Sequence, residues 1–476
     1  MVKCLILAAG KGIRLSKGGD SKPLIPLLGL SLIERVILTA KDAGLTDFYV
    51  VTGYNGEKVR CFLDEFSRNK NVKITHIVND EWEKGNGISV LKARRFFSEK
   101  FILLMTDHIF EEITLANLVR EPITDGEVVL AADFNIKGNN LVDVNDVTKV
   151  SVEDCAISDI GKNLEEYNAY DTGMFLCSPA IFDAIEQSSG NGDTSLSGAV
   201  RILGKEGKAG VFDIGDHYWM DIDTPQDRKK AGNMLCSTLA KPHDGWVSRH
   251  INRKFSTRIF TPLILKLYDR ITPNQVSVVS AVVGAMAGLS FFLHQAVLGG
   301  ILIHLASILD GSDGEIARLK KMQTPFGNFF DAVLDRYSDC FILFGMFYYS
   351  LMSAETTQLF GGFADPFVLL ISGLAISGNL MVSYTSSKSI ADFNYQYQGK
   401  WIAAGRGRDI RLFVLFLGGV MAFLHPISVF VALFLVAAIS NAIVLKRVFL
   451  SWKYSLRKDS LIKRKIKAVI FDFDGT

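Results

Sequence analysis

Residues 310–335 have the types and spacing of a metal-dependent site. They read DGSDGEIARLKKMQTPFGNFFDAVLD and contain two aspartate pairs, each three or four residues apart. In a helix, that spacing places both members of a pair on one face. Carboxylates beside long apolar runs are costly unless cations neutralise them, and Mg²⁺ or Mn²⁺ binds such oxygens while leaving room for phosphates. The four aspartates are Asp310, Asp313, Asp331 and Asp335.

This stretch resembles the signature of the CDP-alcohol phosphotransferases, D-x2-D-G-x2-A-R-x8-G-x3-D-x3-D, at every fixed position. The resemblance implies that an acceptor hydroxyl attacks the β-phosphorus of a bound CDP-alcohol and that CMP leaves. It assigns metal binding to Asp310, Asp313 and Asp331, and both metal and base roles to Asp335. The residues implied to line the nucleotide are Gly314, Ala317, Arg318 and Gly327. The alternative is a polar helix end whose carboxylates are simply solvated. The eight matches to the signature disfavour this alternative.

Composition excludes several classes of protein. The chain has 476 residues and a net charge of +2, and it shows no nucleic-acid-binding motif, so nucleic acid is not an expected partner. Six scattered cysteines indicate reduced thiols rather than a disulfide framework. Apolar residues are unevenly distributed, which predicts a soluble domain at 1–232, a linker with an amphipathic helix at 233–274, a transmembrane domain at 275–450 and a basic tail at 451–476.

The first 232 residues show alternating strand and helix patterns, which predict an open, Rossmann-like α/β sheet. The strand at 2–7 leads into a glycine loop that offers backbone N–H groups to phosphates. Two later stretches supply carboxylates at strand ends, where ligands bind in such sheets. Asp107 follows a buried strand at 102–106, and Asp221 and Asp223 lie in WMDIDTP. A turn at 85–89 offers contacts to a base or ribose.

Together these segments resemble the nucleotidyltransferases that activate sugar and alcohol phosphates. LAAGKGIRL with Lys22, and a later Asp-Thr-Gly triplet, match that family, and the turn at 85–89 is closer to its cytidylyltransferase branch. The resemblance implies attack of a phosphate monoester on the α-phosphorus of CTP without a general base, because the monoester is already ionised. The implied nucleotide contacts are Ala8, Ala9, Gly10, Gly12 and Gly87, with Arg14 and Lys22 on the phosphates. The implied metal ligands are Asp107 with Asp221 or Asp223, of which Asp221 is favoured, and the substrate contacts are Lys162 and Asp171.

The second half of the chain predicts a membrane domain of six helices. Aromatic and basic residues interleave at 241–272, as in a helix that lies in the cytoplasmic interface against membrane lipids. Crossings are expected at 276–293, 297–309, 325–351, 366–386, 410–424 and 427–446. Lys and Arg are confined to alternate connections, so the positive-inside rule predicts a multi-pass protein of the cell membrane with both catalytic domains facing the cytoplasm.

The connection at 388–411 is strongly basic. One interpretation is topogenic charge, and the other is a pocket for the phosphate of an acceptor. The residues of that pocket would be Lys388, Arg406 and Arg408.

The last residues, DFDGT after an apolar run at 466–471, resemble the first motif of haloacid-dehalogenase-type phosphatases. We therefore expect a strand at 466–471 and the start of a truncated phosphatase domain, without phosphatase activity.

The order of the domains resembles a CTP:inositol-1-phosphate cytidylyltransferase fused to a di-myo-inositol-phosphate-phosphate synthase. It implies CTP, inositol 1-phosphate and CDP-inositol as substrates, and a homodimer through the membrane helices. Alternatives are another alcohol phosphate, a lipid acceptor, or an N-terminal domain that only binds its ligand. A transporter is disfavoured because the signature lies at the end of a crossing rather than midway.

Overall fold

The computed structural model describes residues 2–15, 20–239, 246–395, 397 and 407–473, with side-chain surroundings given up to residue 456. It divides into two compact units, Met1–Leu235 and Cys236–Thr476.

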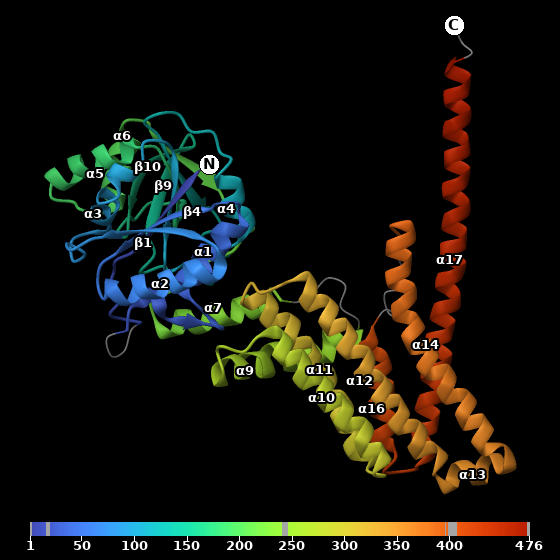
Figure 1. The fold of residues 1–476 in the computed structure, drawn as a ribbon. Coiled ribbons are helices and arrows are strands. Elements are labelled where there is room, and N and C mark those ends of the chain that lie inside the picture. Colours follow the sequence, from blue (N-terminus) through green and yellow to red (C-terminus); the bar gives the residue numbers. More distant parts are fainter. Residues whose placement is uncertain (1, 16–19, 240–245, 396, 398–406, 474–476) are drawn as a thin grey trace. The chain divides into compact units, whose positions relative to one another are not determined.

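The N-terminal unit is built on a nine-stranded mixed sheet with the order β5-β4-β1-β6-β11-β8-β12-β10-β9 (Figure 1). The first four strands of that order are mutually parallel, whereas β11 runs antiparallel to both neighbours. The strands are β1 (Lys3–Ala8), β4 (Asp47–Thr52), β5 (Lys73–Val78), β6 (Phe101–Met105), β8 (Val128–Asp133), β9 (Lys149–Glu153), β10 (Ala156–Gly161), β11 (Ala169–Cys177) and β12 (Ala209–Asp213). Two small pairs accompany them, β2 (Pro26–Leu27) with β3 (Leu30–Ser31), and β7 (His108–Phe110) with β13 (Trp219–Asp221).

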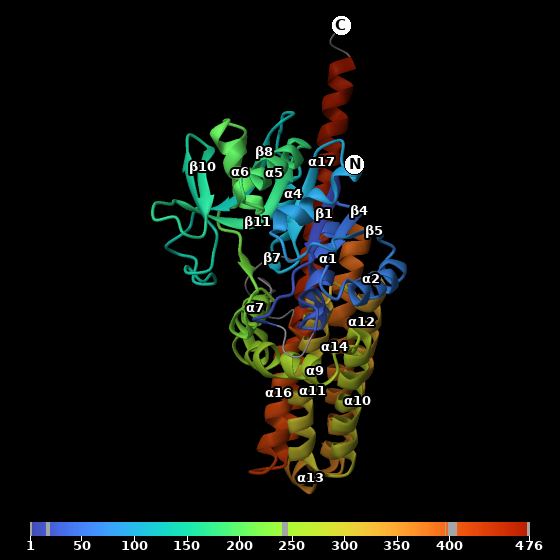
Figure 2. The same cartoon turned by 90° about the vertical axis from the view of Figure 1, so that its left-hand side faces the viewer.

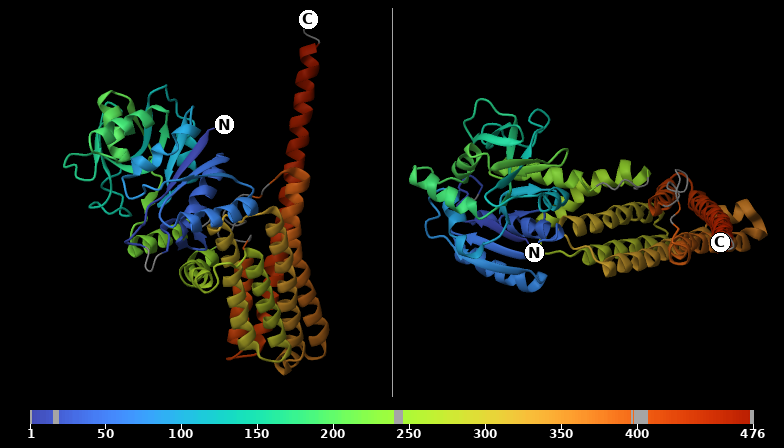
Figure 3. Two further views of the ribbon diagram at one scale, coloured as in Figure 1. Left: turned by 60° about the vertical axis from the view of Figure 1, so that its left-hand side comes forward. Right: turned by 90° about the horizontal axis from the view of Figure 1, so that it is seen from above.

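Helices cover both faces of this sheet (Figure 3). Strand β1 is buried on both faces of the sheet. Its residues Cys4 and Ile6 belong to one hydrophobic core, and Leu5 and Leu7 belong to the other. A strand buried on both sides reads as a continuous apolar run. One core holds α1 (Leu32–Asp42), α2 (Gly56–Lys70) and α4 (Glu112–Leu118), and the other holds α3 (Asn86–Leu91), α5 (Ala180–Gly190) and α6 (Leu196–Lys205). The predicted open α/β fold is confirmed.

The second unit is helical throughout its described residues (Figure 2). Its helices are α8 (Arg253–Phe255), α9 (Thr261–Leu267), α10 (Pro273–Phe292), α11 (Ala296–Leu319), α12 (Pro325–Leu351), α13 (Ala354–Phe360), α14 (Ala364–Phe393), α16 (Arg408–Met421) and α17 (Ile427–Phe473), after α7 (Pro225–Ser237) at the junction of the units. Four described segments are long and apolar enough to cross a membrane: Pro273–Phe292, Ala296–Leu319, Ala354–Phe393 and Ile427–Leu456.

The predicted count of six crossings is not confirmed. A helix lies in each of the six expected ranges, although α16 ends at Met421 rather than at 424, and α12 and α16 are not among the four candidates. The reason lies in their sequences, since α12 carries Asp331, Asp335, Arg336 and Asp339, and α16 has only 14 residues.

The strand expected at 466–471 is wrong, because α17 continues as a helix to Phe473 (Figure 1). A strand needs a neighbouring strand to satisfy its backbone groups, whereas a helix satisfies its own.

Glycines allow α10 and α12 to pack backbone against backbone. A Cβ atom added at Gly345 of α12 would lie 2.2 Å from the carbonyl oxygen of Gly288 in α10. Small residues at such crossings give close van der Waals contact, which drives helix association in a bilayer. The same device joins α11 to α16, where Gly300 meets Gly419.

We predict that Gly345→Ala destabilises the helical unit by about 1–3 kcal/mol, because the new methyl group overpacks this crossing. The measurement is the midpoint of thermal unfolding in detergent. Gly373→Ala in α14 is the matched control, since nothing lies within 4 Å of its added Cβ. Alanine is the better helix former, so the control should be neutral or stabilising. Equal midpoints for the two variants would contradict the prediction.

Candidate active sites

The N-terminal unit has a cavity of about 570 Å³ at the carboxyl ends of β1 and β6. The glycine loop after β1 forms one wall, and Trp82, Asn86 and Ser89 form another. Among the residues predicted to act here, Ala9, Gly10, Gly12, Arg14, Lys22, Asp107 and Asp223 line the cavity.

Lys22 lies between two of the predicted metal ligands. Its Nζ is 2.5 Å from Oδ2 of Asp107 and 2.5 Å from Oδ1 of Asp223, and 9% of its side chain is exposed. Burial lowers the pKa of Lys22, but the charges of the two carboxylates outweigh burial, so the pKa is raised above its usual value. Burial acts oppositely on Asp107, whose pKa is nevertheless lowered by Lys22 and His108. Both groups are therefore charged at neutral pH.

Gly12 makes the position of Lys22 possible. Its φ is +59°, in the left-handed region, and an added Cβ would lie 2.5 Å from Cβ of Lys22. Only glycine satisfies both conditions without strain.

Arg14 and Lys162 share one carboxylate, Asp146, which sequence reasoning missed. Arg14 Nη1 lies 2.5 Å and Lys162 Nζ 2.7 Å from its two oxygens, and Arg14 Nη2 lies 2.7 Å from Asp223. Asp146 thus brings together two of the predicted phosphate-binding residues. Its position in a polar loop, 132 residues from Arg14 in sequence, carries no motif that could have identified it.

A smaller cavity of about 190 Å³ holds the predicted substrate-side residues Lys162 and Asp171, together with Asp221 and His108. Burial raises the pKa of Asp171 to about 6 and also raises that of Asp221. The His108 ring stacks on Trp219 with 6.1 Å between centroids, and its Nδ1 lies 2.9 Å from Asp107. This cavity therefore combines carboxylates with a histidine that the sequence did not single out.

Two of the predicted nucleotide contacts, Gly87 and Ala8, do not line the larger cavity. Gly87 donates its backbone N–H to the carbonyl of Thr194 (3.1 Å), and an added Cβ would lie 2.7 Å from that oxygen. Gly87 therefore allows the backbone to pack closely against Thr194. The nearby residues Asn86 and Ser89 line the cavity. Ala8 is the last residue of β1 and is 1% exposed.

The helical unit has a cavity of about 620 Å³ around the signature. Helix α11 contributes the largest share of its lining. The remaining residues come from α10, α12, the start of α16, the loop between α11 and α12, and the segment before α9. The lining includes the signature residues Asp310, Asp313, Gly314, Ala317, Arg318, Gly327 and Asp331.

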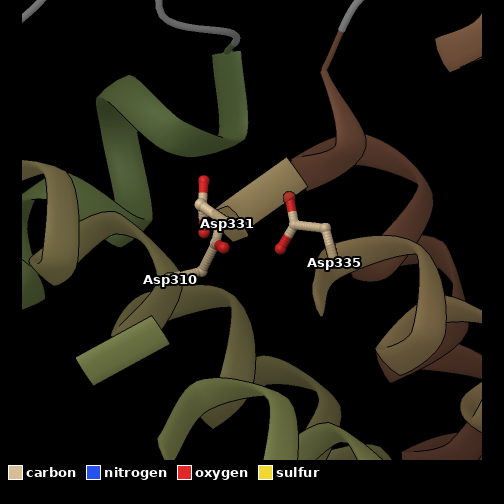
Figure 4. Close-up of side chains that lie close together, drawn as sticks. All are labelled: Asp310, Asp331 and Asp335. Carbon is tan, nitrogen blue, oxygen red and sulfur yellow. The ribbon is translucent and has the colours of Figure 1, made fainter. Parts of the chain in front are cut away.

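Three of the four signature aspartates form a group that fits a metal ion. One carboxylate oxygen from each of Asp310, Asp331 and Asp335 lies within 4.8 Å of the other two. Figure 4 shows the three side chains pointing toward one another from α11 and α12. The fourth, Asp313, is 6% exposed and accepts hydrogen bonds from Ser277 and from the N–H of Gly314.

Arg408, predicted to bind an acceptor phosphate, lies against carboxylates here. Its Nη1 is 2.6 Å from Asp335 and 3.0 Å from Asp310, and its Nε is 2.8 Å from Asp339. Asp339 was not assigned to the site, and it also accepts from Asn379 (3.0 Å). Its position one helical turn after Asp335 is the feature of the sequence that could have assigned Asp339 to the site.

The other two residues predicted to bind the acceptor phosphate are Lys388 and Arg406. Lys388 lies within α14, where its Nζ is 3.0 Å from Asp392 and about half of its side chain is exposed. Arg406 lies outside the described residues. Arg411, one turn after Arg408, was not assigned to the site from the sequence, and it is 6% exposed.

Comparison with known proteins covers both units. Residues 4–203 match the family model of the MobA-like NTP transferase domain, and residues 270–452 match that of CDP-alcohol phosphatidyltransferase. A "Bifunctional IPC transferase and DIPP synthase" of Rubrobacter xylanophilus is 34% identical over 94% of this chain and 95% of its own. One of Archaeoglobus fulgidus is 33% identical over 92% of this chain and 82% of its own. A solved structure titled as the inositol-1-phosphate CTP transferase from T. maritima is 26% identical, covers 48% of this chain and 91% of its own, and gives a TM-score of 0.44. Since similarity at this level extends over nearly the whole length, the chain belongs to the family of bifunctional IPC transferase and DIPP synthase proteins.

Proposed function

We propose that the N-terminal unit makes CDP-inositol from CTP and inositol 1-phosphate. The helical unit then transfers the phosphoinositol group to a second inositol 1-phosphate. The observation that carries this proposal is that both carboxylate-and-cation sites occur on one chain, which is 34% identical over 94% of its length to a bifunctional relative.

In the first reaction, a phosphate oxygen of inositol 1-phosphate attacks the α-phosphorus of CTP. A new P–O bond forms, the bond to the bridging oxygen breaks, and pyrophosphate leaves with its electron pair. The nucleophile is already ionised, so the residues need only position and neutralise charge. Arg14 and the N–H groups of Gly10 and Gly12 would hold the outer phosphates, Lys22 the α-phosphate, and Lys162 the incoming phosphate.

A divalent cation fits this site because two carboxylates already converge on one cationic group, the Lys22 ammonium. We infer that Asp107 and Asp223 are its ligands, since they are the pair that shares Lys22. Asp221 would then act in the smaller cavity beside His108 and Asp171. When bound, Mg²⁺ or Mn²⁺ supplies charge neutralisation for the triphosphate.

In the second reaction, a hydroxyl of the acceptor attacks the β-phosphorus of CDP-inositol, and CMP leaves. An alcohol must lose its proton, and Asp335 is the base that the signature suggests. Asp310, Asp331 and Asp335 would hold the divalent cations together with Asp313, whose carboxylate accepts a hydrogen bond from Ser277. Gly314, Ala317, Arg318 and Gly327 would contact the nucleotide.

We infer that Arg408 and Arg411 bind the phosphate of the acceptor. Arg411 is 6% exposed, and its Nε and Nη1 have no hydrogen-bond partner among the described residues. A buried guanidinium with unused donors favours an anionic ligand.

We also propose that the helical unit crosses the cell membrane six times with both sites facing the cytoplasm. The distribution of Lys and Arg supports this orientation, and α12 and α16 would be the two crossings beyond the four apolar candidates. A homodimer through these helices stays a prediction.

The direct test supplies purified protein with CTP, Mg²⁺ and a panel of alcohol phosphates. Pyrophosphate release should require inositol 1-phosphate, and chromatography with mass detection should show CDP-inositol and then a diinositol product with two phosphates. Equal rates with glycerol phosphate would contradict the assignment of inositol. Product formation only with added lipid would favour a lipid acceptor.

The two reactions should be separable by single substitutions. Asp107→Asn should slow CDP-inositol formation by about 100-fold or more, and leave transfer from supplied CDP-inositol unchanged. Asp335→Asn should have the reverse effect, because it removes the base and a metal ligand. Controls are Asp64→Asn in α2 and Asp365→Asn in the first turn of α14, both of which are exposed. Loss of both activities in either variant would refute separate sites.

The choice between Asp221 and Asp223 is also testable. Asp223→Asn should weaken activation of cytidylyl transfer by Mg²⁺ at least about tenfold, because a metal ligand loses its charge. Asp221→Asn should mainly raise the KM for inositol 1-phosphate. A metal dependence that shifts in the Asp221 variant alone would reverse the assignment.

A further inference from the structure

Glu315 is an unexplained buried acid in the helical unit. It follows Gly314 in α11, at a position that the signature leaves free, and its side chain is 0% exposed. Its Oε1 accepts from Arg253 Nη1 (2.5 Å) and Ser256 Oγ (2.6 Å), and its Oε2 accepts from Thr261 Oγ1 (2.6 Å). Burying a carboxylate is costly unless donors compensate it, and here one cation and two hydroxyls do so.

All three donors come from the helical run between Ser248 and Leu267, which precedes the first candidate crossing. The same run makes further polar contacts with α11. Arg253 Nη1 lies 3.3 Å from the carbonyl of Gly311, and Asn252 Nδ2 donates to Ser307 Oγ (2.9 Å). The run is therefore held on the signature helix by a hydrogen-bonded interface that ends at Glu315.

The held face of this run also lines the signature cavity. Ser248, Asn252, Arg253 and Ser256 belong to its lining, together with Asp310 and Gly314. The residues that contact Glu315 and those that line the cavity thus overlap at Arg253 and Ser256. Displacing the run would move one wall of the space where the donor binds.

A membrane anchor does not account for this interface. The apolar side chains Phe255, Ile259 and Leu263 of the run are 45–50% exposed, whereas its polar residues Asn252, Ser256 and Thr261 are buried. They could contact lipid whether or not Glu315 is charged. A buried ion pair adds little net stability compared with an apolar pair, but it fixes geometry.

We propose that Glu315 is a positioning residue for the phosphotransfer reaction. It fixes the run at 248–267 on α11 so that Asn252, Arg253 and Ser256 form one wall of the CDP-alcohol site. This inference rests on the proposed function, because it assumes that the cavity binds CDP-inositol.

The test is the kinetics of Glu315→Gln with supplied CDP-inositol in the full-length chain. Glutamine keeps the size and one acceptor oxygen, but it loses the charge that holds Arg253. We expect the KM for CDP-inositol to rise about tenfold, with kcat within about twofold, as when a contact made equally in ground and transition states is lost. Cytidylyl transfer by the same preparation should not change. Glu355→Gln in α13, whose acid accepts from Ser353, is the matched control.

Thr261→Val is the second variant, since it removes one donor to Glu315 at a residue outside the cavity lining. It should raise the same KM by a smaller factor, and it decides the matter if Glu315→Gln does not fold. A lower unfolding midpoint with unchanged KM would show a purely structural role and overturn the proposal, as would a fall in kcat alone. Wild-type protein that does not use CDP-inositol would refute the proposed function and this inference together. Wild-type turnover with unchanged KM in both variants would refute only the inference.

Discussion

Carboxylates that lie close together repel one another, and in both candidate sites a basic side chain offsets this repulsion. In the N-terminal unit, Lys22 compensates Asp107 and Asp223 from a position 85 or more residues away in sequence. In the helical unit, Arg408 contacts Asp310, Asp335 and Asp339 from another helix. Gly12 leaves room for Lys22 in the first site, and Asn379 donates a hydrogen bond to Asp339 in the second.

This arrangement has a consequence for the proposed reactions. A divalent cation that takes the carboxylate oxygens would compete with Lys22 or Arg408 for the same contacts. The displaced basic side chain would then be available to a substrate phosphate. Cation binding and phosphate binding would therefore favour each other at both sites, although the two folds have nothing else in common.

The sequence predicted what depends on local spacing. The helical period put Asp331 and Asp335 on one face, and a strand end placed Asp107 at the ligand-binding edge of the sheet. It could not supply partners that meet through tertiary structure, such as Asp146 with Arg14 or Glu315 with Thr261, because no periodicity relates them. Motif resemblance also carries no information on packing. Gly87 lies against Thr194 and does not line the cavity, and residues 466–471 continue a helix.

The two proposed nucleophiles explain why the sites differ in detail. A phosphate monoester needs no base, and the cavity of the first site is lined by the basic residues Lys11, Arg14, Lys22 and Lys84. A hydroxyl needs one, yet both oxygens of Asp335 are engaged, Oδ1 by Arg408 (2.6 Å) and Oδ2 by Arg336 (3.2 Å). Under the proposed function, the acceptor carries a phosphate that competes for Arg408. Its binding would draw Arg408 away from Asp335, in the same direction as cation binding does, and would leave the carboxylate beside the hydroxyl to be deprotonated. Water has no phosphate to add this second pull on Arg408, so the arrangement favours the phosphorylated acceptor over hydrolysis of the donor.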